Sequence, residues 1–310
     1  MSLVPHLRAV TDAANELENQ RAAHLCLVLG RCLHMTGAYA EARPYLERAL
    51  AITEKVFGEE HRYTATALND LALLLQAQGS YEEARPLFER ALAIYEKVLG
   101  EDHPNAAMIL NSLADLLRVQ GSYDNARPLL DRALAIYKKV LGEDHPHTAT
   151  SLNSLALLLS EQGSYEEARF SYEQALDIRK KVLGEEHPDT AQILNNLANL
   201  FNMQGSYGEV RPLYEQALTL TERTYGNEHP RTATSLDNLA MLLHAQGNYE
   251  EARSLCEQAL AIRKKALGDE HPSTATSLNN LATLLYAQGS HEEARLLYEQ
   301  AIEITKKIFG

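Results

Sequence analysis

The sequence predicts an all-α solenoid in which seven antiparallel helix pairs stack one after another behind a short N-terminal capping helix. Two turn motifs support this prediction, because each recurs every 42 residues. The first reads Gly-acid-acid-His-Pro or a close variant, and the second reads Gln-Gly-Ser-Tyr or a close variant. A third observation is that the segments between the turns place their apolar residues with the spacing of a helix rather than of a strand. The glycines of the first motif are Gly58, Gly100, Gly142, Gly184, Gly226 and Gly268, and those of the second are Gly37, Gly79, Gly121, Gly163, Gly205, Gly247 and Gly289.

The expected elements follow in chain order from these turns. Residues 1–19 are predicted to hold the capping helix, because residues 7–16 align with the end of a later second helix. Residues 20–310 then form seven tandem units, each a helix, a Gln-Gly turn and a second helix. The last unit ends inside the pattern without a polar outer face, so we expect either that the chain is a fragment of a longer protein or that this C-terminal repeat self-associates. The predicted units are 20–58, 59–100, 101–142, 143–184, 185–226, 227–268 and 269–310.

The unit 59–100 illustrates why the pairs must stack. Leu68, Leu71 and Leu75 form one apolar stripe on its first helix. Ala84 and Phe88 continue the apolar surface on its second helix, where small residues allow close approach and large ones fill space. A single pair leaves an outer stripe exposed to water, so we expect each pair to pack on the next.

Helix ends carry their own signals. A proline follows the turn histidine in five units, and proline suits the first turn of a helix because its missing N–H costs little there. Before the second helices, Ser80, Ser164 and Ser290 precede a glutamate by three residues, which is the spacing of a capping box, and Asn248 is a variant. The prolines are Pro104, Pro146, Pro188, Pro230 and Pro272.

Composition excludes several classes of function. With 29 Lys and Arg against 42 Asp and Glu, the net charge of −13 disfavours a nucleic-acid partner. No apolar run is long enough for a signal peptide or a membrane span. The three cysteines, Cys26, Cys32 and Cys256, fall at core positions of the repeat and are too few for a disulfide framework. We therefore expect a cytoplasmic protein with no membrane partner.

The pattern of one unit resembles the tetratricopeptide repeat. The usual repeat has 34 residues, and this lengthened form resembles the repeats of kinesin light chain and of bacterial tetratricopeptide sensors and regulators. The resemblance covers residues 20–310 and implies a right-handed superhelix whose concave groove binds a protein or peptide without catalysis. The residues that carry it are Leu68, Leu71, Ala72, Leu75, Gly79, Tyr81, Ala84, Phe88 and Ala91.

The candidate binding residues lie on the face of each first helix opposite its packing stripe. One register of that face is almost uniformly asparagine, and we call it the amide column. An amide both donates and accepts hydrogen bonds, so it suits contact with the backbone of an extended peptide. The alternative is that the column bonds neighbouring helices and stabilises their stacking. The amide column is Asn69, Asn111, Asn153, Asn195, Asp237 and Asn279.

Adjacent registers vary from unit to unit and are expected to select ligand side chains. Kinesin light chain uses basic groove residues for acidic cargo motifs. Because this groove has few basic residues and adds Asp115 and Asp237, that preference is not carried over. The expected selectivity residues are Arg31, Arg118, Asn199, His244 and Tyr286.

The six turn histidines invite a metal hypothesis, which their spacing disfavours. Equivalent residues of stacked pairs lie about one helix diameter, roughly 10 Å, apart, whereas metal ligands must lie within about 2.1 Å of one ion. We therefore expect a turn or cap role and no bound metal. The histidines are His61, His103, His145, His187, His229 and His271.

These observations predict a non-catalytic scaffold that binds a protein or peptide and needs no cofactor. No phosphate loop, nucleophile elbow or zinc signature is present. The alternative is a sensor or regulatory array of a larger effector protein whose catalytic domain lies outside this chain. A purely structural oligomerisation rod is a third hypothesis. The sequence identifies neither the ligand nor the pathway.

Overall fold

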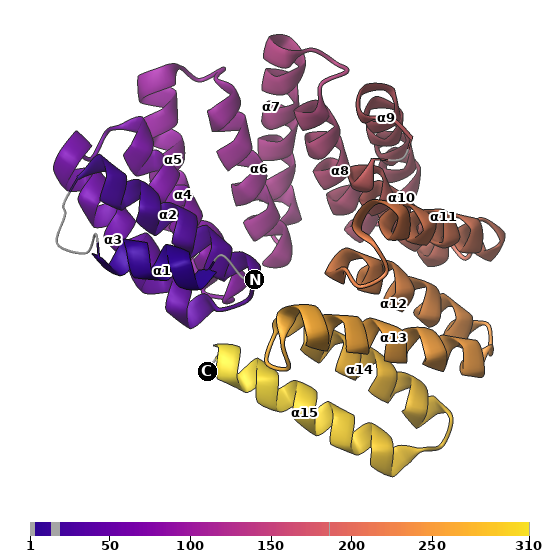
Figure 1. Ribbon diagram of the computed structural model, residues 1–310. Coiled ribbons are helices and arrows are strands. Elements are labelled where there is room, and N and C mark those ends of the chain that lie inside the picture. Colours follow the sequence, from indigo (N-terminus) through magenta and orange to yellow (C-terminus); the bar gives the residue numbers. More distant parts are fainter. Residues whose placement is uncertain (1–3, 14–18, 186, 310) are drawn as a thin grey trace. The chain divides into compact units, whose positions relative to one another are not determined.

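The computed structural model describes residues 4–13, 19–185 and 187–309, which form fifteen α-helices (Figure 1). After the N-terminal helix α1 (Val4–Ala13), the helices alternate between a shorter first helix and a longer second helix of each pair. The first helices are α2 (Gln20–Met35), α4 (Arg62–Ala77), α6 (Pro104–Val119), α8 (Pro146–Glu161), α10 (Pro188–Met203), α12 (Pro230–Ala245) and α14 (Pro272–Ala287). The second helices are α3 (Tyr39–Phe57), α5 (Tyr81–Leu99), α7 (Tyr123–Leu141), α9 (Tyr165–Leu183), α11 (Tyr207–Tyr225), α13 (Tyr249–Leu267) and α15 (His291–Phe309).

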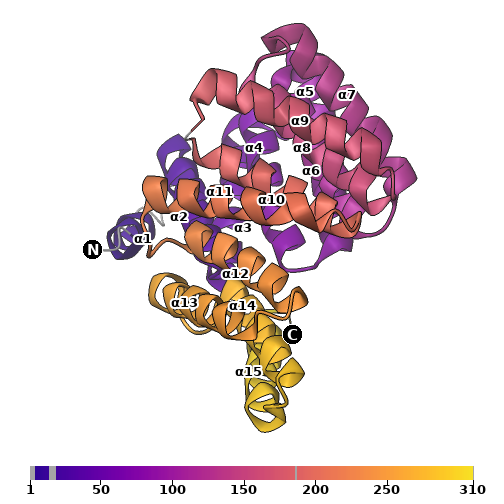
Figure 2. The same cartoon turned by 90° about the vertical axis from the view of Figure 1, so that its right-hand side faces the viewer.

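The chain divides into two compact units, Met1–Glu143 and Asp144–Gly310. In each unit every first helix packs on its own second helix, and every second helix packs on the first helix of the next pair. Figure 2 shows the same pairing from a second direction. The predicted fold of consecutive antiparallel helix pairs is therefore confirmed.

The N-terminal helix lies at the predicted place. α1 packs on α2, and its residue Arg8 forms an ion pair with Glu41 of α3. Thr11 of α1 is buried, so the helix covers part of the first pair. The end of the predicted helix, residues 14–16, lies outside the described residues.

Packing inside and between pairs follows the predicted stripe. Leu68, Ala72 and Phe88 are fully buried in the pair α4–α5. Between pairs, Leu92 of α5 packs against a buried cluster of the next pair that includes Ala107. Since small and large residues alternate across these contacts, the helices approach closely without leaving space unfilled.

The turns adopt the backbone that the glycines predict. Gly79 has a φ of 76° and Gly100 a φ of 98°, values in the left-handed region where other residues are strained. The five prolines after the turn histidines stand in the first turn of α6, α8, α10, α12 and α14, as predicted. Both signals therefore mark the helix ends correctly.

The predicted capping boxes are wrong for the serines that the structure describes at helix starts. Ser80 and Ser164 occupy the N-cap position, but neither side chain caps the helix, and Asn248 behaves likewise. The backbone at Ser80 has a ψ of 60°, outside the extended conformation that a capping side chain needs. Its carbonyl oxygen instead accepts from the amides of Glu83 and Ala84.

One smaller prediction, on the burial of the cysteines, also differs from the structure. Cys26 and Cys256 are buried as expected, whereas Cys32 is only half-buried. All three cysteines are free thiols.

Candidate functional site

The six turn histidines are the N-caps of their first helices. In each case the imidazole Nδ1 accepts a hydrogen bond from the backbone amide two residues later, at 3.0–3.2 Å. The predicted cap role is therefore confirmed. Because Nδ1 must carry a lone pair to accept, each cap requires an unprotonated Nδ1. The residues are His61, His103, His145, His187, His229 and His271.

Burial and neighbouring cations favour that neutral form in two caps. Burial lowers the pKa of His229, and the charge of Arg231 lowers it further. Burial likewise lowers the pKa of His271, with a smaller effect from Arg263. Over the residues that the structure describes, no group of three or more His, Cys, Asp or Glu side chains is arranged to hold a metal ion.

The candidate binding face of the first helices is polar and accessible along one register. Thr150, Gln192, Thr234 and Thr276 are exposed, and Met108 at the same register is 39% exposed. These residues lie one helical turn before the amide column, so they form the rim beside it. Ligand atoms can reach this register directly.

The amide column lies deeper than its neighbours. Asn69 and Asn195 are buried, at 6% and 8% exposure, and Asp237 is 3% exposed. Asn111 and Asn153 are half-buried, and only Asn279, in the last pair, is exposed. The column therefore lies at the floor of the face rather than on its open surface.

Hydrogen bonds from this column cross between pairs. In the second unit, the Asn195 Nδ2 donates to the Ser235 hydroxyl at 3.4 Å. The Asn196 Nδ2 of the same helix donates to the Asn153 Oδ1 at 2.9 Å. The column thus contributes to stacking, as one of the two sequence hypotheses expects. However, the Oδ1 atoms of Asn69 and Asn195 are buried and meet no hydrogen-bond donor among the described residues.

Asp237 is the acidic member of the column and forms a buried ion pair. Its Oδ2 lies 2.8 Å from the Arg263 NH1, and both side chains are almost fully buried, at 5% and 6% exposure. The Ser277 hydroxyl also donates to this oxygen, at 2.9 Å. Burial raises the pKa of Asp237 despite these partners, because the loss of hydration destabilises the charged carboxylate more than its partners stabilise it. This carboxylate oxygen is therefore already bonded within the core.

The five predicted selectivity residues differ in their freedom. The Arg31 Nε donates to Asp70 at 2.7 Å, and Arg118 donates to Asp115 at 2.8 Å. The Asn199 side chain is exposed and accepts from the Tyr214 hydroxyl. His244 is half-buried with its ring near Tyr249, whereas Tyr286 is 60% exposed. Because Arg31 and Arg118 already carry carboxylate partners, Tyr286 is the most accessible of the five.

A cavity of about 310 Å³ opens on this face at the pair α10–α11. It brings a residue of the amide column, Asn195, together with rim residues and with a side chain of the second helix. The sequence did not indicate that second-helix residue, Thr221, or Arg231 of α12. The cavity is lined by Ala191, Gln192, Asn195, Thr221, Arg231 and Thr234.

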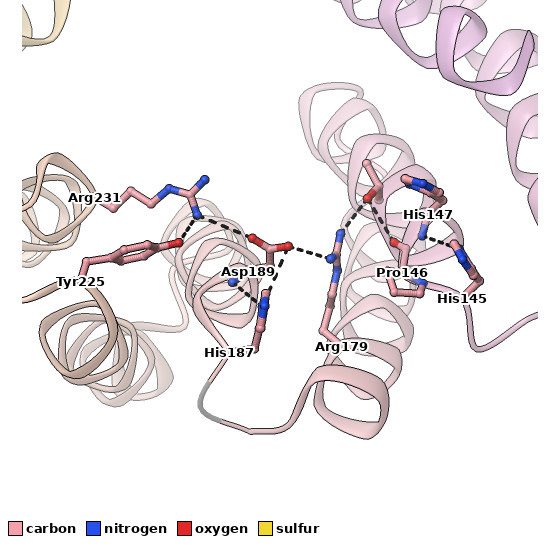
Figure 3. Close-up of polar contacts among 9 residues, drawn as sticks. His145, Pro146, His147, Arg179, His187, Asp189, Tyr225 and Arg231 are labelled. Carbon is pink, nitrogen blue, oxygen red and sulfur yellow. Dashed lines mark hydrogen bonds and ion pairs between the residues drawn. The ribbon is translucent and has the colours of Figure 1, made fainter. Parts of the chain in front are cut away.

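Arg231 of the cavity lining belongs to a cluster of charged side chains from α9, α10 and α12 (Figure 3). Asp189 of α10 lies 2.8 Å from the Arg179 NH1 and 3.6 Å from the Arg231 NH1. Arg231 also donates to the Tyr225 hydroxyl at 2.6 Å. Two guanidinium groups thus share one carboxylate, which leaves this cluster with more positive than negative charge.

The family follows from these repeats and from comparison with known proteins. The model of the tetratricopeptide repeat matches residues 20–97, 63–119, 105–181, 171–223, 189–253 and 232–307. The chain is a tetratricopeptide repeat protein. The comparison of this tetratricopeptide repeat protein with curated proteins gives no match.

Solved structures of other tetratricopeptide repeat proteins show the same fold. A putative kinesin light chain with TPR-like repeats from Podosopora anserina is 34% identical, with a TM-score of 0.52, and the match covers 66% of this chain and 97% of that one. BtubC from P. vanneervenii is 24% identical, with a TM-score of 0.56, and the match covers 76% of this chain and 92% of that one.

A match that covers more of this chain is to a conjugation gene regulator. The Rap conjugation gene regulator of the plasmid pLS20, solved in complex with the Phr* peptide, is 17% identical. It aligns with a TM-score of 0.67 over 92% of this chain and 74% of that one. At this identity the likeness shows the fold alone.

No helix in the described ranges is both long and apolar enough to cross a membrane.

Proposed function

We propose that this tetratricopeptide repeat protein is a non-catalytic scaffold that binds an extended peptide segment along the first-helix faces. One observation carries the proposal. The Asn195 Oδ1 is a buried acceptor without a donor, and its side chain lines an open cavity on that face. A buried polar atom left unpaired costs about 1–3 kcal/mol, which a peptide N–H placed there recovers.

The amide column then has two roles that do not exclude each other. At Asn195 the Nδ2 bonds the next pair while the Oδ1 remains for the ligand, whereas the Asn153 Oδ1 already accepts from Asn196. In the first unit the Asn69 Oδ1 is likewise buried without a donor. An acceptor that binds backbone N–H groups contacts the peptide main chain, which is the same for any peptide sequence. The varied rim residues then supply the selectivity.

The likeness to the Rap regulator supports the peptide as ligand class, since that protein was solved with a peptide bound. It also favours the second candidate, a sensor or regulatory array of a larger effector protein whose catalytic domain lies outside this chain. In both cases the repeats bind a peptide, and the two differ in what the binding controls. We place this binding in the cytoplasm, in keeping with the three free cysteines.

We further propose that the last pair binds a second copy of this chain. Ile302 of α15 is 53% exposed, whereas its equivalent in the preceding pair, Leu260, packs against Ala275 and Leu278 of the next first helix. A cavity of about 580 Å³ opens beside it. Two copies of α15 related by a two-fold axis present the same apolar surface to each other, which suits a closed dimer.

Peptide binding is tested by selection and substitution. Peptides from a phage-displayed random library are selected on the full chain, and the affinity of one selected peptide is measured for the wild type and for Asn153→Ala with Asn195→Ala. Each lost hydrogen bond is expected to weaken binding by about 1 kcal/mol, or roughly fivefold.

Thermal stability of the same variant separates ligand contact from stacking. We expect a modest loss, because the Asn195 and Asn153 bonds between pairs disappear too. Ala114→Leu is the matched control: Ala114 is fully buried, so overpacking there costs about 1–3 kcal/mol of stability without touching the amide column. A double variant that is destabilised but binds the peptide as well as the wild type contradicts the proposal.

A further inference from the structure

Three cavities of the structure occupy the same place in the repeat. Each is lined by a first helix and its second helix beside the amide column, and those at α2–α3 and α10–α11 are also lined by the next first helix. In each, the lining includes the residue at one same position of the second helix. We call this the filling position. It recurs every 42 residues, and its members are Thr53, Tyr95, Tyr137, Arg179, Thr221, Arg263 and Thr305.

All three cavities have a threonine at the filling position. Thr53 lines a cavity of about 290 Å³ at the pair α2–α3. Thr221 lines the cavity of about 310 Å³ at α10–α11, and Thr305 lines the cavity of about 580 Å³ at α14–α15. Threonine is short, so it leaves open the space between the two helices.

A longer side chain at the filling position crosses that space. The Tyr95 hydroxyl lies 2.8 Å from the Thr66 hydroxyl of its own first helix, and Tyr95 is only 2% exposed. The Arg179 NH2 donates to the Thr150 hydroxyl at 2.7 Å (Figure 3). In both pairs the side chain reaches the rim register that Gln192 occupies at α10–α11. The space that Thr221 leaves open is therefore occupied by the protein itself in these pairs.

We infer that the filling position determines which pairs accept a ligand side chain, and that α10–α11 binds an Asn or Gln side chain of the peptide. The inference rests on the proposed function and adds the anchor pocket to it. The cavity at α10–α11 has a buried amide at the column, Asn195, whereas the amide at the α14–α15 cavity, Asn279, is exposed to water. The equivalent residue at α2–α3 is Leu27, which offers no acceptor.

The groups that line this pocket select a carboxamide. The buried Asn195 Oδ1 needs a hydrogen-bond donor. Arg231 at the rim offers N–H groups and, with Arg179, outnumbers the single carboxylate of Asp189. A carboxylate cannot donate to Asn195, and an ammonium cannot accept from Arg231 and is repelled by it. A carboxamide does both from separate atoms, because its NH₂ donates and its oxygen accepts, whereas a hydroxyl must contact both partners through one oxygen.

The test closes the pocket with a residue that the chain already uses. Thr221→Tyr introduces the side chain of Tyr95 and Tyr137, and Thr221→Tyr with Gln192→Thr also restores the threonine that Tyr95 contacts in its own pair. Thr219→Tyr is the control, since Thr219 is exposed on the same helix. Random peptides are selected on phage against the wild type and against Thr221→Tyr, and the affinity of one wild-type-selected peptide is measured for all four proteins.

We expect the wild-type pool to be enriched in Asn or Gln at one position and the Thr221→Tyr pool to lack this enrichment. The wild-type-selected peptide loses about tenfold or more in affinity to both closed variants, and less than about twofold to Thr219→Tyr. The inference is overturned if the closed variants bind the peptide as the wild type does. If that happens while Asn153→Ala with Asn195→Ala still weakens binding, the proposed function stands without this pocket. A pool without Asn or Gln enrichment overturns the ligand assignment, and failure to select any peptide overturns both proposals.

Discussion

The buried ion pair between Asp237 and Arg263 offers a sharp test of how the repeat uses equivalent positions. In the pairs α4–α5 and α6–α7 the same two positions hold asparagine and tyrosine. We therefore consider three variants: Arg263→Tyr, Asp237→Asn, and the two changes together. The double variant reproduces a combination that the chain already contains twice.

The expected magnitudes follow from burial. Arg263→Tyr leaves the Asp237 carboxylate, 5% exposed, without its counter-ion, and Asp237→Asn leaves the guanidinium unpaired. Breaking a buried pair in this way costs about 3–5 kcal/mol. In the double variant no charge remains buried. Because burial raises the pKa of Asp237 even with Arg263 present, the charged pair itself is costly, and the double variant should lie within about 1 kcal/mol of the wild type.

Hydrogen exchange is the suitable assay, because long repeat arrays can unfold in parts and a single unfolding midpoint then averages over them. The free energy of opening is measured for the buried amides of α12 and α13 in all four proteins. Large losses in both single variants, with recovery in the double variant, support the reasoning. If the losses of the single variants add in the double variant, the equivalence of positions between repeats is refuted.

The remaining predictions concern pH and self-association. The pKa values of His229 and His271 are lowered from the ordinary value of 6.5, so on acidification the unfolded chain binds these protons before the folded chain does. The free energy of unfolding is therefore expected to fall as the pH drops below 6.5 and through the lower pKa values of the folded state. His229→Asn with His271→Asn keeps a capping side chain and should reduce the loss of unfolding free energy at low pH, measured by urea titration at several pH values. His24→Asn, at an exposed histidine, should not reduce it, and an unchanged pH profile in the double variant contradicts the cap argument. Ile302→Glu should abolish a concentration-dependent dimer in sedimentation velocity, while Val182→Glu, at a residue 45% exposed, should not; a wild type that stays monomeric at all concentrations contradicts the dimer.

The fold could be predicted in detail because each expectation was repeated down the chain. A turn glycine, a proline in the first turn or a buried alanine such as Ala72 has an equivalent at almost every 42-residue step. The capping boxes were mispredicted because spacing alone does not report the backbone. The turn at Gly79 leaves Ser80 with a ψ of 60°, at which its hydroxyl does not cap the helix.

The candidate site could be predicted only in part. The sequence placed the candidate residues on one face of the first helices, but the depth of Asn69 and Asn195 depends on how closely the next pair packs, which no single helix reveals. The filling position was missed because it lies on the second helix, and its side chains reach the first helix only across the folded pair. Its signal was present in the sequence as an alternation of Thr, Tyr and Arg at one position, such as Thr53, Tyr95 and Arg179.

Peptide binding on the first-helix faces is tested most directly by mapping where a bound peptide lies. A peptide selected on the wild type is added to the isotope-labelled full chain, and chemical-shift changes are recorded for backbone amides and for Asn side-chain NH₂ groups. The account predicts the largest changes at Gln192, Asn195 and Thr234, with little change at exposed second-helix residues such as Thr219. Changes concentrated on the second helices, with the Asn195 side chain unaffected, would contradict it.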